Sequence, residues 1–298
     1  MRKLIRHLLD RTPYIGGLRE QNRRAGRYPP GHFYSPIPAP ADVAAYLGSR
    51  RHDGNLGGID LRSSEQLRLL GQFEPFYKDL PFSEEPRPDC RYYFGQTTFC
   101  YADAIFLYSL LRQLQPKEIS EVGSGYSSAV MLDTVDRFLP SPPGITLVEP
   151  FPVTLRKLLR PDDYARVTLI EDRVQHVPLE RFKALGPGDL LFIDSSHVLK
   201  CGSDVQFLMF EVLPVLAVGV VVHFHDVFES FEYPREWLME GWYWNEDYAL
   251  RAFLSYNAAW EISLFGNYAV NSFREFFAAN MPLCLKNPGG SLYIRRAA

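Results

Sequence analysis

Short apolar runs alternate along the chain with segments whose apolar residues recur at helical spacing. The runs show little polar alternation, which is typical of strands buried on both faces by helices. This alternation predicts an α/β fold, a doubly wound, Rossmann-like sheet of mostly parallel strands with a hairpin-like pair at the end. The seven predicted strands are 118–122, 145–150, 167–172, 189–197 (with the loop that follows), 218–226, 260–267 and 291–296, and the predicted helices are 103–113, 129–135, 153–160, 202–216 and 247–256.

The N-terminal part follows a different pattern. Residues 1–35 are basic, and 32–43 combine aromatic residues with prolines, which favour extended and turn conformations. Apolar spacing predicts a helix within 60–77. We predict that residues 1–90 form an N-terminal cap or lid and that 91–298 form the sheet domain. The basic run is either a docking surface for an anionic partner or a solvated arm.

Composition is that of an ordinary globular chain. The chain has 298 residues, 46% of them hydrophobic and 22% charged, with a net charge of −3. This charge gives no reason to expect a nucleic acid or a membrane as partner. The four cysteines lie far apart without a Cys-x-x-Cys pair, which predicts reduced thiols. No apolar stretch reaches the roughly 18 residues of a membrane span, and polar residues interrupt the basic start. We therefore expect a cytoplasmic protein.

The stretch 118–128, EISEVGSGYSS, predicts a strand, a Gly-x-Gly turn and the start of a helix. Glycines 123 and 125 lack a Cβ, so the backbone can turn tightly and approach a ligand. A dinucleotide turn favours a third glycine where this chain has Ser128. Glu121 is a poor neighbour for a pyrophosphate but suits the cationic methionine end of S-adenosylmethionine (AdoMet). The alternative is a turn without a ligand.

At this turn the chain resembles the class I AdoMet-dependent methyltransferases, whose first motif is an acid-x-Gly-x-Gly turn. The resemblance implies that Glu149, at the end of the second predicted strand, binds the ribose of the cofactor, as acids at this position do in Rossmann sites. It places Asp172, the last residue of the third predicted strand, near the adenine. The cofactor-binding residues expected in all are Glu121, Gly123, Ser124, Gly125, Ser127, Ser128, Glu149, Asp172 and Asp194.

Histidines and aspartates follow two further strands, in IDSSH (193–197) and HFHD (223–226). Because the carboxyl ends of parallel strands meet at one edge, these side chains should converge. Side chains alternate along a strand, so His223 and His225 should point the same way, unless the chain leaves strand geometry near Asp226. The alternative is that the histidines only cap strands.

The same residues resemble the metal site of catechol-type O-methyltransferases. The resemblance implies a divalent ion (Mg, Mn, Fe or Zn) held by Asp194, His225 and Asp226. Histidine replaces an aspartate of that family, and imidazole favours Zn, Fe, Ni or Mn over Mg. His197 and Lys200 are then candidate bases. Without a metal, His197 or His225 would act as base, held by Asp226 or Asp204.

Residues 32–245 as a whole resemble a bacterial group of class I methyltransferases of the "methyltransferase domain 24" type, through FYSPIP, EVGSGYSS, DSSH and HFHDVFESFEYPREW. We expect an AdoMet-dependent methyltransferase acting on a hydroxyl of a small-molecule or sugar-like acceptor. The aromatic stretch 228–244 could line the acceptor pocket, or it could form an apolar cover or a homodimer surface.

Three other functions compete with this expectation. A nicotinamide-dependent oxidoreductase could use the same sheet, although Ser128 and the lack of a Tyr-x-x-x-Lys pair argue against it. A metal-dependent hydrolase or oxygenase could use the HxHD cluster, with the glycine turn merely structural. A non-catalytic AdoMet-binding module is the third.

Overall fold

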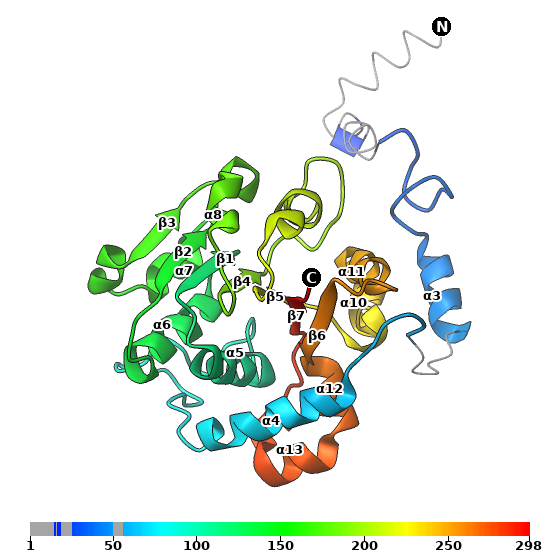
Figure 1. The fold of residues 1–298 in the computed structure, drawn as a ribbon. Helices are drawn as coiled ribbons and strands as arrows, with labels where there is room; N and C mark the ends of the chain where they lie inside the picture. Colours follow the sequence, from blue (N-terminus) through cyan, green and yellow to red (C-terminus); the bar gives the residue numbers. More distant parts are fainter. Residues whose placement is uncertain (1–14, 16, 19–25, 50–55) are drawn as a thin grey trace, which may run out of the picture. The chain divides into compact units, whose positions relative to one another are not determined.

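The computed structural model describes residues 15, 17–18, 26–49 and 56–298, and Figure 1 shows its ribbon. A single sheet has the strand order β3-β2-β1-β4-β5-β7-β6. The strands from β1 to β5 pair in parallel, and β7 pairs antiparallel with both β5 and β6. The predicted seven-stranded, mostly parallel, Rossmann-like sheet is confirmed. The strands are β1 Glu118–Val122, β2 Gly144–Val148, β3 Val167–Ile170, β4 Leu190–Ile193, β5 Val221–Phe224, β6 Trp260–Phe265 and β7 Leu292–Arg296.

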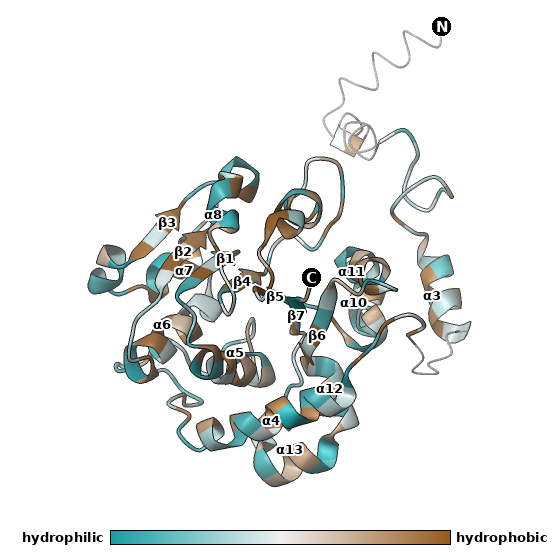
Figure 2. Ribbon diagram, in the orientation of Figure 1, coloured by the Kyte–Doolittle hydropathy of each residue, from teal (hydrophilic) through white to brown (hydrophobic). Residues whose placement is uncertain are grey.

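Helices cover both faces of the sheet. The four residues of β4 are all buried, and they alternate between two clusters of hydrophobic side chains, with Phe192 in one and Ile193 in the other. This explains why the strand sequences are apolar without alternation. Strands β2, β3 and β4 are accordingly largely brown in Figure 2.

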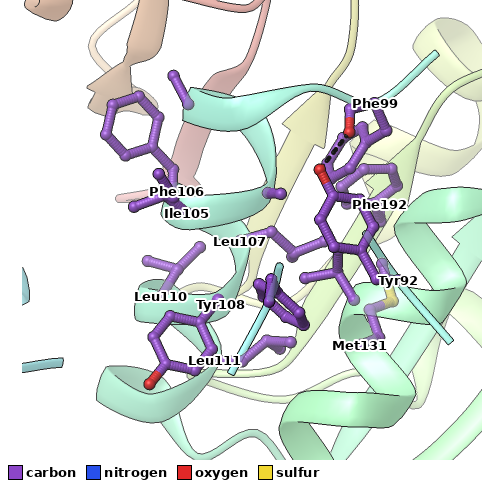
Figure 3. Close-up of a cluster of buried hydrophobic side chains, with 14 of the residues drawn as sticks. Tyr92, Phe99, Ile105, Phe106, Leu107, Tyr108, Leu110, Leu111, Met131 and Phe192 are labelled. Carbon is purple, nitrogen blue, oxygen red and sulfur yellow. Dashed lines mark hydrogen bonds between the residues drawn. The ribbon is translucent and has the colours of Figure 1, made fainter. Parts of the chain in front are cut away.

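One hydrophobic core lies between the sheet and the helices α4 (Ser63–Tyr77), α5 (Tyr101–Leu114) and α6 (Tyr126–Phe138). Figure 3 shows its centre, where Leu107 of α5 lies on the side of the helix that faces Phe192 of β4, and Phe106 points the other way. The hydroxyl of buried Tyr92 donates to the carbonyl oxygen of Phe99 at 2.7 Å. Helix α12 (Gly266–Ser272) lies beside α4, and α13 (Arg274–Asn280) packs against α12 (Figure 1). The predicted helix at 103–113 is confirmed as α5.

The second core includes side chains of α8 (Leu179–Lys183), α9 (Asp204–Phe207) and α11 (Glu246–Leu254). The predicted helix at 202–216 exists, but its winding changes along its length. After α9, residues Leu208–Val212 form a π-helical turn and Leu213–Val215 a 3₁₀ turn. Pro214 lies in this last turn, and proline cannot continue an α-helical ladder because it lacks an N–H.

Contacts divide the chain into two units, one of residues 1–53 with 234–243 and the other of residues 54–233 with 244–298. The smaller unit contains α3 (Pro40–Ser49), which packs on α10 (Arg235–Glu240). Part of the segment expected to be extended, 32–43, is therefore helical, because proline is tolerated in the first turn of a helix. The larger unit contains α4. A cap role for 1–90 stays a prediction, and most of the basic run 1–35 lies outside the described residues.

Each cysteine carries a free thiol, as predicted. Of the helices in the described ranges, none is both long enough and apolar enough to cross a membrane.

Candidate functional site

A cavity of about 500 Å³ lies at the carboxyl ends of the strands around β1. The strand order reverses between β1 and β4, and this is where open α/β sheets bind their ligands. The volume is in the range of small-molecule sites, roughly 300–1,000 Å³. The lining residues are Val122, Gly123, Val148, Glu149, Pro150, Phe151, Arg173, Val174, Gln175, Asp194, Ser195, Ser196, Lys200, Ser203 and Asp204.

The glycine turn begins where β1 meets the end of β4. Gly123 has a φ of 81°, and a Cβ there would lie 1.6 Å from the carbonyl oxygen of Asp194. The Gly123 N–H donates to the carbonyl oxygen of Val148 at 3.0 Å, and the Asp194 N–H donates to that of Val122 at 2.8 Å. Only glycine fits this conformation and this approach of two backbones.

Glu121 lies beneath the turn, fully buried, and is not among the residues that line the cavity. One carboxylate oxygen accepts a bond from the Ser127 hydroxyl at 2.6 Å, and the other accepts one from the Ser128 hydroxyl. The Ser128 oxygen also accepts from the Gly125 N–H at 3.1 Å. Burial raises the pKa of Glu121 to about 8, although the serine hydroxyls act in the opposite direction. Glu121, Ser127 and Ser128 thus fix the turn to the start of α6.

Glu149 lies on the cavity wall at the end of β2. Its two oxygens accept bonds from the N–H groups of Ser124 at 3.1 Å and Phe151 at 2.7 Å. A carboxylate has about four acceptor positions, so each oxygen retains capacity for a ligand hydroxyl. The hydroxyls of Ser124 and Ser195 are buried and bond to no group in the described part of the chain. Ser195 also lines the cavity, where a ligand could use its hydroxyl.

Asp172 lies at the end of β3 but does not line the cavity. Its carboxylate accepts from the Arg173 N–H at 2.7 Å and pairs with Nδ1 of His176 at 2.8 Å. The neighbouring Arg173 and Gln175 take part in the wall instead. The assignment of Asp172 to the adenine stays a prediction.

The structure brings together Asp194 and His197 after β4 with His225 and Asp226 after β5. We call these four residues the His/Asp cluster. The Asp194 carboxylate lies 3.4 Å from Nε2 of His197 and 3.6 Å from Nδ1 of His225. Asp226 lies 3.6 Å and 3.5 Å from the same two nitrogens. His197 and Asp226 both have a φ of 57°, so the chain leaves strand geometry at these positions.

His223 and Lys200 do not belong to this cluster. The His223 ring stacks on Phe192 with centroids 3.8 Å apart, and its Nε2 lies 3.1 Å from the Ser291 hydroxyl. Burial keeps the pKa of His223 well below its ordinary value, so the ring is neutral. Lys200 is exposed on the cavity wall, and its N–H donates to the Ser203 hydroxyl at 3.1 Å.

Charge balance in the His/Asp cluster decides its protonation. Burial acts against the charged forms, but the neighbouring acids outweigh it for both histidines. Asp194 and Glu246 raise the pKa of His197 to about 10, and Asp194 with Asp226 raises the pKa of His225 well above its usual value. His225 and His197 in turn lower the pKa of Asp194 despite its burial. At neutral pH both rings are therefore protonated.

Comparison with known proteins identifies the family. The sequence model described as "Methyltransferase domain" matches residues 120–227, which include the glycine turn and the His/Asp cluster. An uncharacterised protein of Archaeoglobus fulgidus is 34% identical over 172 residues, which are 55% of this chain and 76% of that protein. The chain belongs to the methyltransferase-domain family.

Solved structures with a similar fold include two methyltransferases. The SAH-bound Podospora anserina methyltransferase PaMTH1 is 16% identical, with a TM-score of 0.44, and the match covers 87% of this chain and 95% of that one. The O-methyltransferase TomG from Streptomyces achromogenes, in complex with SAM, is 14% identical, with a TM-score of 0.42 and coverages of 87% and 96%.

The metal ligands expected from the catechol-type resemblance, Asp194, His225 and Asp226, lie close together in this family member. Within residues 26–49 and 56–298, however, no group of three or more His, Cys, Asp or Glu side chains is arranged to hold a metal ion. Nε2 of His197 and Nδ1 of His225 instead face the carboxylates of Asp194 and Asp226 at 3.4–3.6 Å.

Two buried acids, Glu246 and Asp103, contact the cluster but were not predicted. Glu246 begins α11, and its carboxylate lies 2.9 Å from Nδ1 of His197. Asp103, in α5, lies 3.6 Å from Nε2 of His225. An acid in an otherwise apolar helix, as in DAIFLYSLL, is the signal that could have indicated Asp103, because a buried charge needs a partner.

Proposed function

We propose that the protein is an AdoMet-dependent methyltransferase that transfers the methyl group to a hydroxyl oxygen of a small-molecule or sugar-like acceptor. One observation carries the proposal beyond family membership. Asp194 belongs both to the wall of the cavity and to the His/Asp cluster, so a bound cofactor and the groups that can move a proton share one residue.

The cavity suits AdoMet in the chemistry of its walls. Glu149 has acceptor capacity for ribose hydroxyls, and the Gly123 turn exposes backbone beside it. AdoMet, when bound, supplies the methyl group, and its sulfonium sulfur takes the electron pair of the breaking carbon–sulfur bond. The protein must align the acceptor oxygen with that carbon and take the hydroxyl proton.

Proton transfer requires a change in the His/Asp cluster. In the free protein His197 and His225 hold protons against ionised acids and cannot accept another. A cation bound beside Asp194 offsets the negative charge of that carboxylate and so lowers the pKa of both histidines. A ring that loses its proton in this way can act as general base for the acceptor hydroxyl. Lys200, on the same wall, is the second candidate.

A calorimetric comparison of AdoMet with S-adenosylhomocysteine (SAH), its neutral demethylated product, tests this account. In the pH range between the ordinary histidine pKa of about 6.5 and the pKa of about 10 for His197, the His197 ring of the free protein carries a proton. The sulfonium cation should cause this proton to be released. At pH 8 we expect AdoMet binding to release protons, seen as a binding enthalpy that varies with the ionisation enthalpy of the buffer. SAH binding should release fewer. If neither ligand binds, the proposed function is wrong; equal proton release by both ligands would contradict only the role of the cluster.

A divalent ion at Asp194, His225 and Asp226 stays a prediction of the resemblance. Elemental analysis of the purified protein by mass spectrometry would detect it.

A further inference from the structure

Residues at and just before the start of α11 contact both the ring and the backbone of His197. Its Nδ1 lies 2.9 Å from Oε2 of Glu246, and both side chains are buried. Its carbonyl oxygen accepts from the N–H groups of Asn245 at 3.1 Å and Glu246 at 3.2 Å. The indole of Trp244 lies against the ring, with centroids 4.4 Å apart. The ring therefore has one orientation, with Nε2 turned toward the two aspartates of the cluster.

A further pair of bonds joins the same two segments. Asn245 accepts from the Leu199 N–H at 2.6 Å and donates to the Leu199 carbonyl oxygen at 3.2 Å. The loop after β4 and the first turn of α11, nearly fifty positions apart in the chain, are thus joined residue by residue. These backbone and side-chain bonds fix the position of Glu246 relative to His197. The contact between the two side chains is therefore part of a larger attachment between the two segments.

We propose that Glu246 is a positioning residue, whose carboxylate fixes the rotamer and the tautomer of His197 so that Nε2 is the atom that exchanges protons with the acceptor. This inference rests on the proposed function. In the transfer, the acceptor oxygen forms a bond to the methyl carbon, the carbon–sulfur pair goes to sulfur, and the hydroxyl proton passes to Nε2. The Nδ1 proton stays on the ring and remains hydrogen-bonded to the Glu246 carboxylate throughout. Nε2 is then the nitrogen that accepts the proton, since the hydrogen bond at one ring nitrogen determines the role of the other.

His225 lacks an equivalent partner. Its Nε2 lies 3.6 Å from the Asp103 carboxylate, which is beyond hydrogen-bond distance. This nitrogen forms no hydrogen bond with any described residue. The other oxygen of Asp103 accepts from the Gly290 N–H at 3.0 Å and the Ser291 hydroxyl at 2.6 Å. Of the two cluster histidines, His197 is therefore the one whose ring is positioned by a directly bonded acid.

NMR of protein labelled with ¹⁵N-histidine tests the inference without a known acceptor. In the wild type, the Nδ1 proton of His197, assigned with His197→Asn, should be protected from exchange with water. Glu246→Leu should raise its exchange rate at least ~10-fold, because the hydrogen bond is lost. Glu246→Gln should restore protection, since its amide oxygen still accepts. Asp247→Leu is the matched control, because Asp247 is equally buried and bonds to the Phe228 N–H instead.

Protection lost in Glu246→Leu and kept in Asp247→Leu would support the positioning role, and protection kept in both would overturn it. If Glu246→Leu does not fold, the exchange rate of the His197 Nδ1 proton in the wild type tests the inference instead. An unprotected proton there would also overturn it. AdoMet titration of the same wild-type sample separates the two proposals. Absence of AdoMet binding would overturn the proposed function, while the exchange data still judge the Glu246–His197 pair.

Discussion

Gly123→Val should reduce the affinity for AdoMet at least ~100-fold, equivalent to about 2.8 kcal/mol. A Cβ at this position would lie 1.6 Å from the Asp194 carbonyl oxygen, and the φ of 81° is unfavourable for a β-branched residue. The ends of β1 and β4 must therefore separate. This separation moves the backbone of the glycine turn, which bonds to Glu149, and it moves Asp194 on the cavity wall. Calorimetric titration of AdoMet measures the loss.

Gly71→Val is the matched control for this substitution. Gly71 lies on the exposed side of α4, and a Cβ there meets no atom within 4 Å. This variant should bind AdoMet like the wild type. Circular dichroism shows whether each variant is folded. Wild-type affinity in a folded Gly123→Val protein would mean that the cofactor does not use this turn.

Arg91→Leu should lower the free energy of unfolding by about 3–5 kcal/mol, the cost of leaving buried charges without their partner. The Arg91 guanidinium is buried and donates to Asp133 at 2.7 Å, Asp136 at 2.8 Å and Asp163 at 2.6 Å. Arg166 and Arg91 hold the pKa of Asp136 below its ordinary value despite burial. Removing Arg91 leaves the side chains of Asp133 and Asp163 buried, and Arg166 compensates only part of their charge.

Urea denaturation of Arg91→Leu and of Arg87→Leu checks this expectation. Arg87 is exposed and pairs with Asp89 at 3.1 Å, so its loss should cost no more than about 1 kcal/mol. An equal, small effect of the two substitutions would contradict a structural role for the buried arginine.

The sheet could be predicted because burial on both faces leaves a direct trace in the sequence. The run at 189–197 became β4, Leu190–Ile193, and that at 218–226 became β5, Val221–Phe224, and both strands are buried throughout. The turn at Gly123 could also be predicted from the sequence. The approach of the Asp194 carbonyl oxygen tolerates no side chain, so this position requires a glycine that is visible in the sequence. Helix α3 was missed, since prolines before it favour an extended chain and only Pro40 falls where a helix accepts one.

The candidate site was less predictable because its partners come from distant segments. Strand-end chemistry placed Asp194, His197, His225 and Asp226 at one edge, and the structure brings them together. The sequence could not assign Glu246 to His197, since that contact depends on how α11 returns to the loop after β4. The protonation of the histidines was also beyond the sequence, because it depends on distances to several carboxylates at once.

The most direct test of the cofactor assignment is calorimetric titration of AdoMet and NAD into the wild type and Glu149→Gln, with Glu171→Gln as control. Glu171 is an exposed acid after β3 that pairs with Arg156 and does not line the cavity. We expect AdoMet to bind and NAD not to bind. Affinity for AdoMet should fall ~10–100-fold in Glu149→Gln alone, because bonds to a charged acceptor are lost. Binding of NAD without AdoMet, or equal AdoMet affinity in all three proteins, would contradict this account of the cavity.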